Sequence, residues 1–251
     1  MISQKIKINI LLGCGMLSLL IFLFPAIPQS AAYHDFADAR VFYTVPNFLN
    51  VLSNLPFAII GLWGIIYLLK HATQFKSQER LMFSFLFSGI FLVCFGSAYY
   101  HYQPNNITLV WDRLPMTIVF MSFFVLIISR YVNERAGFIL LFPLLIIGVS
   151  SVYYWYYTEQ QGRGDLRLYA WVQFFPALII PVILILFRDK KGFNKELVWI
   201  AFWYVIAKVL EHFDKEIYSL LHVVSGHSLK HLAAAVSTYY MFVVMRNIST
   251  R

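Results

Sequence analysis

Five polar residues carry the side chains best suited to chemistry in this chain of 251 residues. They are three histidines, one carboxylate and one hydroxyl: His101, His227, His231, Asp112 and Ser97. Each stands at or near the end of an otherwise apolar segment. Imidazole nitrogens are common zinc ligands, and a catalytic zinc takes about three protein ligands while keeping a position for water. The three histidines therefore form a candidate metal site.

The spacing of these residues places them on helix faces. Ser97 and His101 are four residues apart, as are His227 and His231, and residues four apart share one face of a helix. Zinc lowers the pKa of a bound water to about 7, and a nearby carboxylate can accept the proton during attack on a carbonyl. Asp112 is our candidate for this base, and Ser97 for a donor to the water or to the developing oxyanion.

The composition indicates an all-α polytopic membrane protein that must position these residues. Hydrophobic residues make up 60% of the chain and charged residues only 13%. A membrane-spanning helix needs about 20 mostly apolar residues, whereas lipid-exposed strands would leave backbone groups unpaired. Apolar segments predict helices at about 8–28, 48–70, 81–101, 113–130, 137–157, 168–187, 197–215 and 222–246.

The first apolar segment stands apart from the others. We expect an extra N-terminal apolar helix within residues 1–30, followed by a seven-helix transmembrane bundle over residues 31–251. Lys5 and Lys7 precede the apolar stretch, and the small residues Ser30, Ala31 and Ala32 follow it. A cleaved signal peptide and a retained anchor both remain open.

Lysine and arginine are distributed unequally among the loops. With a cytoplasmic N-terminus, 13 of these residues fall on the cytoplasmic side and 7 on the other, and the larger group includes Arg188, Lys190, Lys191 and Arg251. This asymmetry predicts that both termini are cytoplasmic and that the candidate site lies near the outer, periplasmic or lumenal, face. The net charge of +8 then follows from topology and anionic lipid, without a nucleic-acid partner.

Structural explanations also exist for each polar residue taken singly. A lone histidine in a membrane helix often only hydrogen-bonds to a neighbour, and H-x-x-x-H matches many helices by chance. Ser97 could be a small residue at a helix crossing. Asp112 could cap a helix that begins at Arg113 and has Pro115 in its first turn. The expected arrival of three separate elements at one depth favours the functional interpretation.

A second charged group consists of Lys208, Glu211 and Asp214, which follow one another at intervals of three in the predicted segment 197–215. Ionisable residues inside a membrane are costly and are functional candidates by default. A proton relay is one interpretation. We favour a structural ion pair between Lys208 and Glu211, with Arg40 or Lys230 as further partners.

Residues from about 35 to 245 resemble the alkaline ceramidases, which belong to a larger group of seven-helix membrane hydrolases that includes the progestin and adiponectin receptors. The family pattern S-x-x-x-H, with an Asp eleven residues after the His, is met by Ser97, His101 and Asp112. Its closing H-x-x-x-H is met by His227 and His231. The opening of the second segment also matches, through Pro46, Asn47, Asn50, Ser53 and Asn54.

The resemblance implies a seven-helix fold with a zinc ion held by the three histidines and an Asp that works on the water at the metal. It also implies hydrolysis of the amide bond of a ceramide-like or other N-acyl lipid from the membrane, which yields a fatty acid and an amine of the sphingoid type. Two other classes remain open. One is a receptor-like or lipid-binding protein with a structural metal, and the other is a proton-coupled transporter.

One departure from the family concerns calcium. Eukaryotic alkaline ceramidases have an acidic N-terminal segment that binds calcium, and the counterpart here contains Asp35, Asp38 and Arg40, with Asn47 further on. A guanidinium offers no acceptor, and calcium takes about six to eight oxygen ligands. We therefore expect calcium to be absent or weakly bound, with Arg40 paired to Asp38 and tying this loop over the site.

Overall fold

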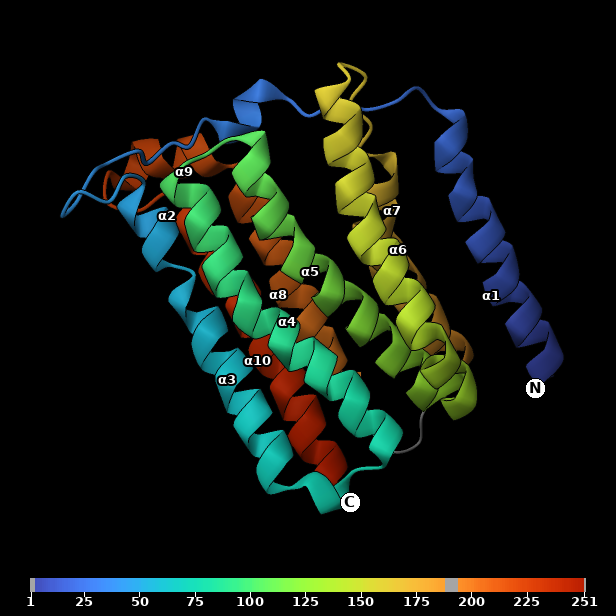
Figure 1. The fold of residues 1–251 in the computed structure, drawn as a ribbon. Coiled ribbons are helices and arrows are strands. Elements are labelled where there is room, and N and C mark those ends of the chain that lie inside the picture. The colour runs from blue at the N-terminus through green and yellow to red at the C-terminus, as the bar shows by residue number, and fades with distance from the viewer. Residues whose placement is uncertain (1–2, 188–193, 251) are drawn as a thin grey trace. The chain divides into compact units, whose positions relative to one another are not determined.

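The computed structural model describes residues 3–187 and 194–250, and the chain is helical throughout most of these ranges (Figure 1). The long helices are α1 (Gln4–Ser18), α3 (Leu55–Lys70), α4 (Ser77–Tyr102), α5 (Asn106–Ile127), α6 (Glu134–Gln160), α7 (Arg167–Leu186), α8 (Asn194–His212) and α10 (Gly226–Ser249). Two short helices, α2 (Phe48–Leu52) and α9 (Asp214–Leu221), flank the candidate site. No β-sheet occurs in the described ranges, so the prediction of an all-α protein is confirmed.

Six helical segments are long and apolar enough to cross a membrane, which supports an integral membrane protein. They are Gln4–Leu23, Phe48–Lys70, Ser77–Tyr102, Asn106–Val132, Glu134–Gln160 and Arg167–Leu186. Among the described residues, α8 and α10 are not in this set, and both carry charged side chains discussed below. The seven-helix count with one extra helix and the orientation of the chain stay predictions. Arg188, Lys190, Lys191 and Arg251, used for the orientation, lie outside the described residues.

The chain forms two compact units. One comprises Met1–Gln29 and Phe120–Gly192, and the other comprises Ser30–Val119 and Phe193–Arg251. All five candidate site residues belong to the second unit. The predicted division into residues 1–30 and 31–251 stays a prediction.

In the second unit, α10 packs along α8 and also contacts α3, while α3 packs along α4 (Figure 1). The side chains between these helices are large and apolar, and Phe87, Phe242 and Leu86 are fully buried. Because α3 contacts both α4 and α10, this apolar packing fixes the positions of these two helices. It thereby holds the two helices that carry the histidines.

In the first unit, the N-terminal segment is fastened to the start of α7. Arg167 pairs with Asp165 and donates hydrogen bonds to the backbone carbonyls of Phe22 and Phe24. The indole nitrogen of Trp171 donates to Ser18 Oγ at 2.8 Å. These bonds hold the C-terminal end of the first apolar segment against α7.

The start of α5 differs from its prediction. The helix begins at Asn106, about two turns before residue 113, because Asn105 Oδ1 accepts hydrogen bonds from the backbone amides of Ile107 and Thr108. The prediction that Asp112 caps a helix starting at Arg113 is therefore wrong. Asp112 lies within the helix, and Pro115 lies in its interior rather than in its first turn.

The end of α8 also differs from the predicted segment 197–215. The helix ends at His212, and Asp214 opens the separate helix α9 after Phe213, which has φ −96° and ψ 30°. Lys208 and Glu211 thus share a helix with each other but not with Asp214. The even spacing by three in the sequence does not continue as one helix face.

Candidate metal centre

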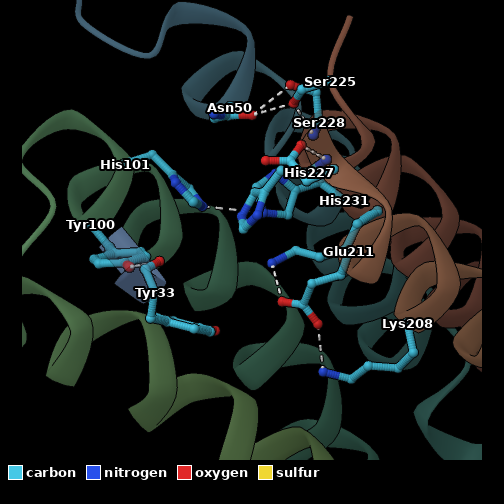
Figure 2. A network of polar contacts seen from close by, with 12 residues as sticks. Tyr33, Asn50, Tyr100, His101, Lys208, Glu211, Ser225, His227, Ser228 and His231 are labelled. Atoms are coloured by element: carbon cyan, nitrogen blue, oxygen red, sulfur yellow. Dashed lines mark hydrogen bonds and ion pairs between the residues drawn. The ribbon is translucent and has the colours of Figure 1, made fainter. Parts of the chain in front are cut away.

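The three histidines come from two helices that meet in the second unit (Figure 2). The last turn of α4 supplies His101, and the first two turns of α10 supply His227 and His231. All three side chains are buried. Their ring centroids are 4.8 Å apart for His101 and His227, 4.8 Å for His101 and His231, and 5.0 Å for His227 and His231. The rings therefore form a nearly equilateral triangle.

Two of the ring nitrogen atoms have no hydrogen-bond partner. His101 Nε2 lies 3.2 Å from His231 Nε2, and His231 Nδ1 lies 2.8 Å from Ser53 Oγ. His227 Nε2 and His101 Nδ1 are buried and have no hydrogen-bond partner. Buried polar atoms in folded proteins almost always have a partner. One potential ligand atom from each ring lies within 4.8 Å of the others, so this group fits a metal ion.

Ser97 and Asp112 meet where α4 and α5 approach each other closely. The Ser97 hydroxyl donates a hydrogen bond to the Asp112 carboxylate, and both side chains are buried. Gly96 permits this approach, because a Cβ at that position would collide with the backbone carbonyl of Trp111. Ser97 also lies one helical turn before His101 on the same face of α4. The structure thus brings the predicted base and hydroxyl together beside the helix end that carries His101.

The start of α10 is fixed by side chains from neighbouring segments. Ser225 caps the helix by accepting a hydrogen bond from the Ser228 amide at 3.2 Å. Asp214 accepts the His227 amide at 2.7 Å through one oxygen and the Ala37 amide at 3.0 Å through the other. The carboxylate of Asp214 therefore joins α9, the loop before α2 and the first turn of α10.

The asparagines of α2 hold the same helices from another direction. Asn50 Oδ1 accepts a hydrogen bond from Ser228 Oγ at 2.6 Å, and Asn50 Nδ2 donates to the Asp38 carbonyl at 3.3 Å. Asn47 Nδ2 donates to the His101 carbonyl at 2.8 Å. Sequence reasoning reached these asparagines only through the family resemblance. Their contacts show that they connect α2 to both histidine-bearing helices.

Phe36 is a site neighbour that the sequence did not indicate. Its ring centroid lies 4.7 Å from that of His101 and 4.6 Å from that of His227, and its side chain is buried. The ring packs against two of the three imidazoles and limits how they can rotate. No periodicity or motif singles out this phenylalanine among the 24 in the chain.

Arg40 binds the Asp38 carboxylate in the acidic segment that corresponds to the calcium-binding segment of the eukaryotic enzymes. Its guanidinium contacts both Asp38 oxygens at 2.7 Å and donates to the Val223 carbonyl at 2.5 Å. Burial alone would raise the pKa of Asp38, but the hydrogen bonds from Arg40 lower it below its ordinary value. Because a cation already sits on this carboxylate and arginine brings no oxygen ligand, the residues present do not fit a calcium site.

The other charged residues singled out from the sequence, which could form a network supporting the site, lie in separate groups: Asp35, Asp38, Arg40, Lys208, Glu211 and Asp214. Glu211 accepts hydrogen bonds from Lys208 at 2.8 Å and from Lys230 at 2.9 Å (Figure 2). Asp35 pairs with Lys215 at 2.7 Å on the surface. Lys230 is thus a partner of Glu211, whereas Arg40 is engaged with Asp38.

Comparison with known families identifies the family of the chain. The sequence profile of the ceramidase family matches residues 37–251. The chain belongs to the ceramidase family. No curated protein sequence matches it significantly. The matched range contains all five candidate site residues, and it begins after α1. Membership implies a hydrolase that acts on the amide bond of a ceramide-type lipid.

Proposed function

We propose that this ceramidase-family protein is a zinc-dependent hydrolase of a ceramide-like or other N-acyl lipid. The observation that carries the proposal is the buried triangle of His101, His227 and His231, with the buried Ser97 hydroxyl one helical turn before His101 and hydrogen-bonded to the buried carboxylate of Asp112. Three imidazoles are a ligand set of catalytic zinc. A zinc ion held there would polarise the amide carbonyl and make a water molecule more acidic.

The carboxylate of Asp112 is suited to move the proton. It accepts a proton from the water whose oxygen forms the new bond to the amide carbon. It then delivers that proton to the amide nitrogen as the carbon–nitrogen bond breaks. The products are a fatty acid and an amine of the sphingoid type. The buried position of Asp112 limits competition from bulk water for this proton.

Ser97 has a positioning role in this proposal. Its hydroxyl donates to Asp112 and so orients the carboxylate. The same hydroxyl lies on the face of α4 that carries His101. Because a hydroxyl has one proton, Ser97 would donate to an oxyanion on the carbonyl oxygen only after releasing Asp112. We place this chemistry near the outer membrane face, with the lipid entering from the bilayer.

The proposal is tested by metal analysis combined with lipid mass spectrometry on purified wild-type protein and His231→Ala. We expect about one zinc per wild-type chain and release of fatty acid from an amide-linked lipid, with both lost in the variant. His71→Ala is the matched control, because His71 stacks on Tyr67 at the end of α3 and is outside the histidine triangle. Wild-type protein without stoichiometric metal and without activity on any amide-linked lipid would contradict the proposal.

A receptor-like protein with a structural metal is the second candidate, because a three-histidine group can hold a metal without catalysis. The substitution Asp112→Asn separates the two. It should abolish amide hydrolysis in an enzyme, whereas lipid binding and metal content should survive unchanged in a receptor. The transporter alternative would require a mobile proton at Glu211, whose two oxygens are both held by lysines.

A further inference from the structure

Two segments near the site expose apolar side chains to the outside of the protein. The loop before α2 exposes Val41, Phe42 and Tyr43, and Tyr43 is 83% exposed. The end of α9 and the residues after it expose Leu220, Leu221 and Val223, and Leu220 is 79% exposed. We call these six residues the apolar rim. Exposed apolar side chains gathered in this way usually mark a contact surface.

The first part of the apolar rim is a tight hairpin. Phe42 and Val45 exchange backbone hydrogen bonds of 3.1 and 3.0 Å around the two turn residues Tyr43 and Thr44. Both turn residues have positive φ, 46° and 66°. This conformation suits glycine and asparagine and is unfavourable for an aromatic or β-branched side chain. The backbone is thus held in a strained turn that projects an aromatic residue outward.

The residues with strained backbone are concentrated in these two segments. The non-glycine residues with positive φ in the described ranges are Tyr43, Thr44, Asn47 and His222. Three belong to the loop before α2 and its junction with that helix, and His222 ends α9. Strained backbone that the surrounding structure maintains tends to occur where it serves a function.

Arg40 ties the two parts of the apolar rim together. Its guanidinium donates to the Val223 carbonyl at 2.5 Å, and its carbon Cζ lies 5.6 Å from the ring centroid of Tyr218 on α9. The Ala37 amide also donates to Asp214 at the start of α9. The loop that carries the hairpin therefore lies beside α9 and the residues after it (Figure 1).

The position of the hairpin in the chain brings it close to the bilayer. The candidate membrane span Phe48–Lys70 begins three residues after Val45, which closes the hairpin. Three extended residues reach at most about 10 Å. The hairpin must therefore lie near the depth at which this span enters the membrane, where tyrosine and other amphipathic aromatic side chains are enriched.

We propose that the apolar rim is immersed in the boundary between the lipid head groups and the acyl chains. The occupant of this surface is the membrane in which the helices stand, rather than water. Phe36 and Asp38 belong to the same loop as the hairpin. Phe36 packs against His101, and Asp38 pairs with Arg40. Immersion of the apolar rim would therefore keep the loop that borders the histidine site within the leaflet. This inference does not depend on the proposed hydrolase activity.

Spin labels report the surroundings of each position directly. In a background with Cys14→Ser and Cys94→Ala, single cysteines replace Tyr43 or Leu220 and are labelled in lipid nanodiscs. The collision rate of each label with oxygen, which partitions into lipid, is compared with that of a nickel chelate, which stays in water. Ile59→Cys is the lipid-facing control, since Ile59 is 65% exposed within the span Phe48–Lys70. Lys215→Cys on α9 is the aqueous control, with a side chain 66% exposed.

We expect the labels at positions 43 and 220 to have several-fold higher oxygen-to-nickel collision ratios than the label at position 215, approaching the ratio at position 59. Ratios equal to that at position 215 would place the apolar rim in water and overturn the proposal. Low collision rates with both reagents would indicate a protein contact, such as a second copy of the chain, and would also overturn it. Position 43 lies in the loop before α2 and position 220 in α9, so a folding defect in one variant leaves the other as a test.

Discussion

Two groups of polar side chains lie side by side on α10, and their surroundings differ in kind. His231 belongs to the histidine triangle, where His227 Nε2 and His101 Nδ1 have no hydrogen-bond partner. Lys230, the preceding residue, belongs to the group in which Glu211 accepts hydrogen bonds from two lysines. The first group leaves ligand atoms available, whereas in the second both oxygens of the carboxylate are engaged.

This difference shows that a charge in an apolar helix is not sufficient evidence for a functional site. A charge removed from water needs a partner of opposite charge, and Glu211 obtains two such partners from α8 and α10. Neutral imidazoles cost less to bury, so three of them can be gathered with nitrogen atoms left open. This difference supports the proposal that the histidines carry the chemistry and that the lysine–glutamate group has a structural role.

The largest effect is expected from removing a metal ligand. His101→Ala should lower the rate of hydrolysis by about 1000-fold or more, because a bound metal stabilises the transition state by several kcal/mol. Each tenfold change in rate corresponds to about 1.4 kcal/mol. Zinc content, measured by mass spectrometry, should fall together with lipid hydrolysis. A variant that keeps both would remove His101 from the metal site.

The next effect separates metal binding from proton transfer. Asp112→Asn should reduce hydrolysis by about 100-fold or more, since general acid–base groups contribute at least that much. Zinc content should stay at the wild-type level, because Asp112 is not among the three proposed ligands. Loss of zinc in this variant would instead make Asp112 a ligand or a structural residue.

A substitution in the lysine–glutamate group should lower the stability of the protein and leave the chemistry of the site unchanged. Glu211→Gln leaves Lys208 and Lys230 without their counter-charge, and we expect the free energy of unfolding to fall by about 1 to 3 kcal/mol. This is less than for a fully buried pair, because the Glu211 side chain is 21% exposed. Denaturant unfolding in detergent measures it, with Glu216→Gln on the exposed face of α9 as the control. Lost zinc at unchanged stability would show that the group serves the site.

The smallest effect tests how the histidines are oriented. Ser53→Ala removes the hydrogen-bond partner 2.8 Å from His231 Nδ1, and loss of a side chain that orients a metal-binding histidine lowers metal affinity by about 10-fold or more. Competition with a zinc chelator measures the affinity, and Ser219→Ala on exposed α9 is the control. Equal affinities in both variants would show that His231 is oriented without Ser53.

Local sequence patterns predicted the helices and the pairing of residues on their faces. Ser97 with His101, and His227 with His231, share helix faces because a spacing of four follows from the helix repeat alone. The apolar segments indicated helices because membrane-spanning backbone must satisfy its own hydrogen bonds. The start of α5 was predicted incorrectly, since the Asn105 cap outweighed the signal from Pro115.

The sequence by itself determined that this is an all-α membrane protein with histidines paired on helix faces. Only the tertiary structure decided which side chains surround them. Ser53 reaches His231 from 178 positions away, and Asp214 joins Ala37 to His227. Phe36 packs against two imidazoles, and no sequence motif predicts this contact. Such contacts depend on how helices and loops pack, because local periodicity fixes directions within one element and not distances between elements.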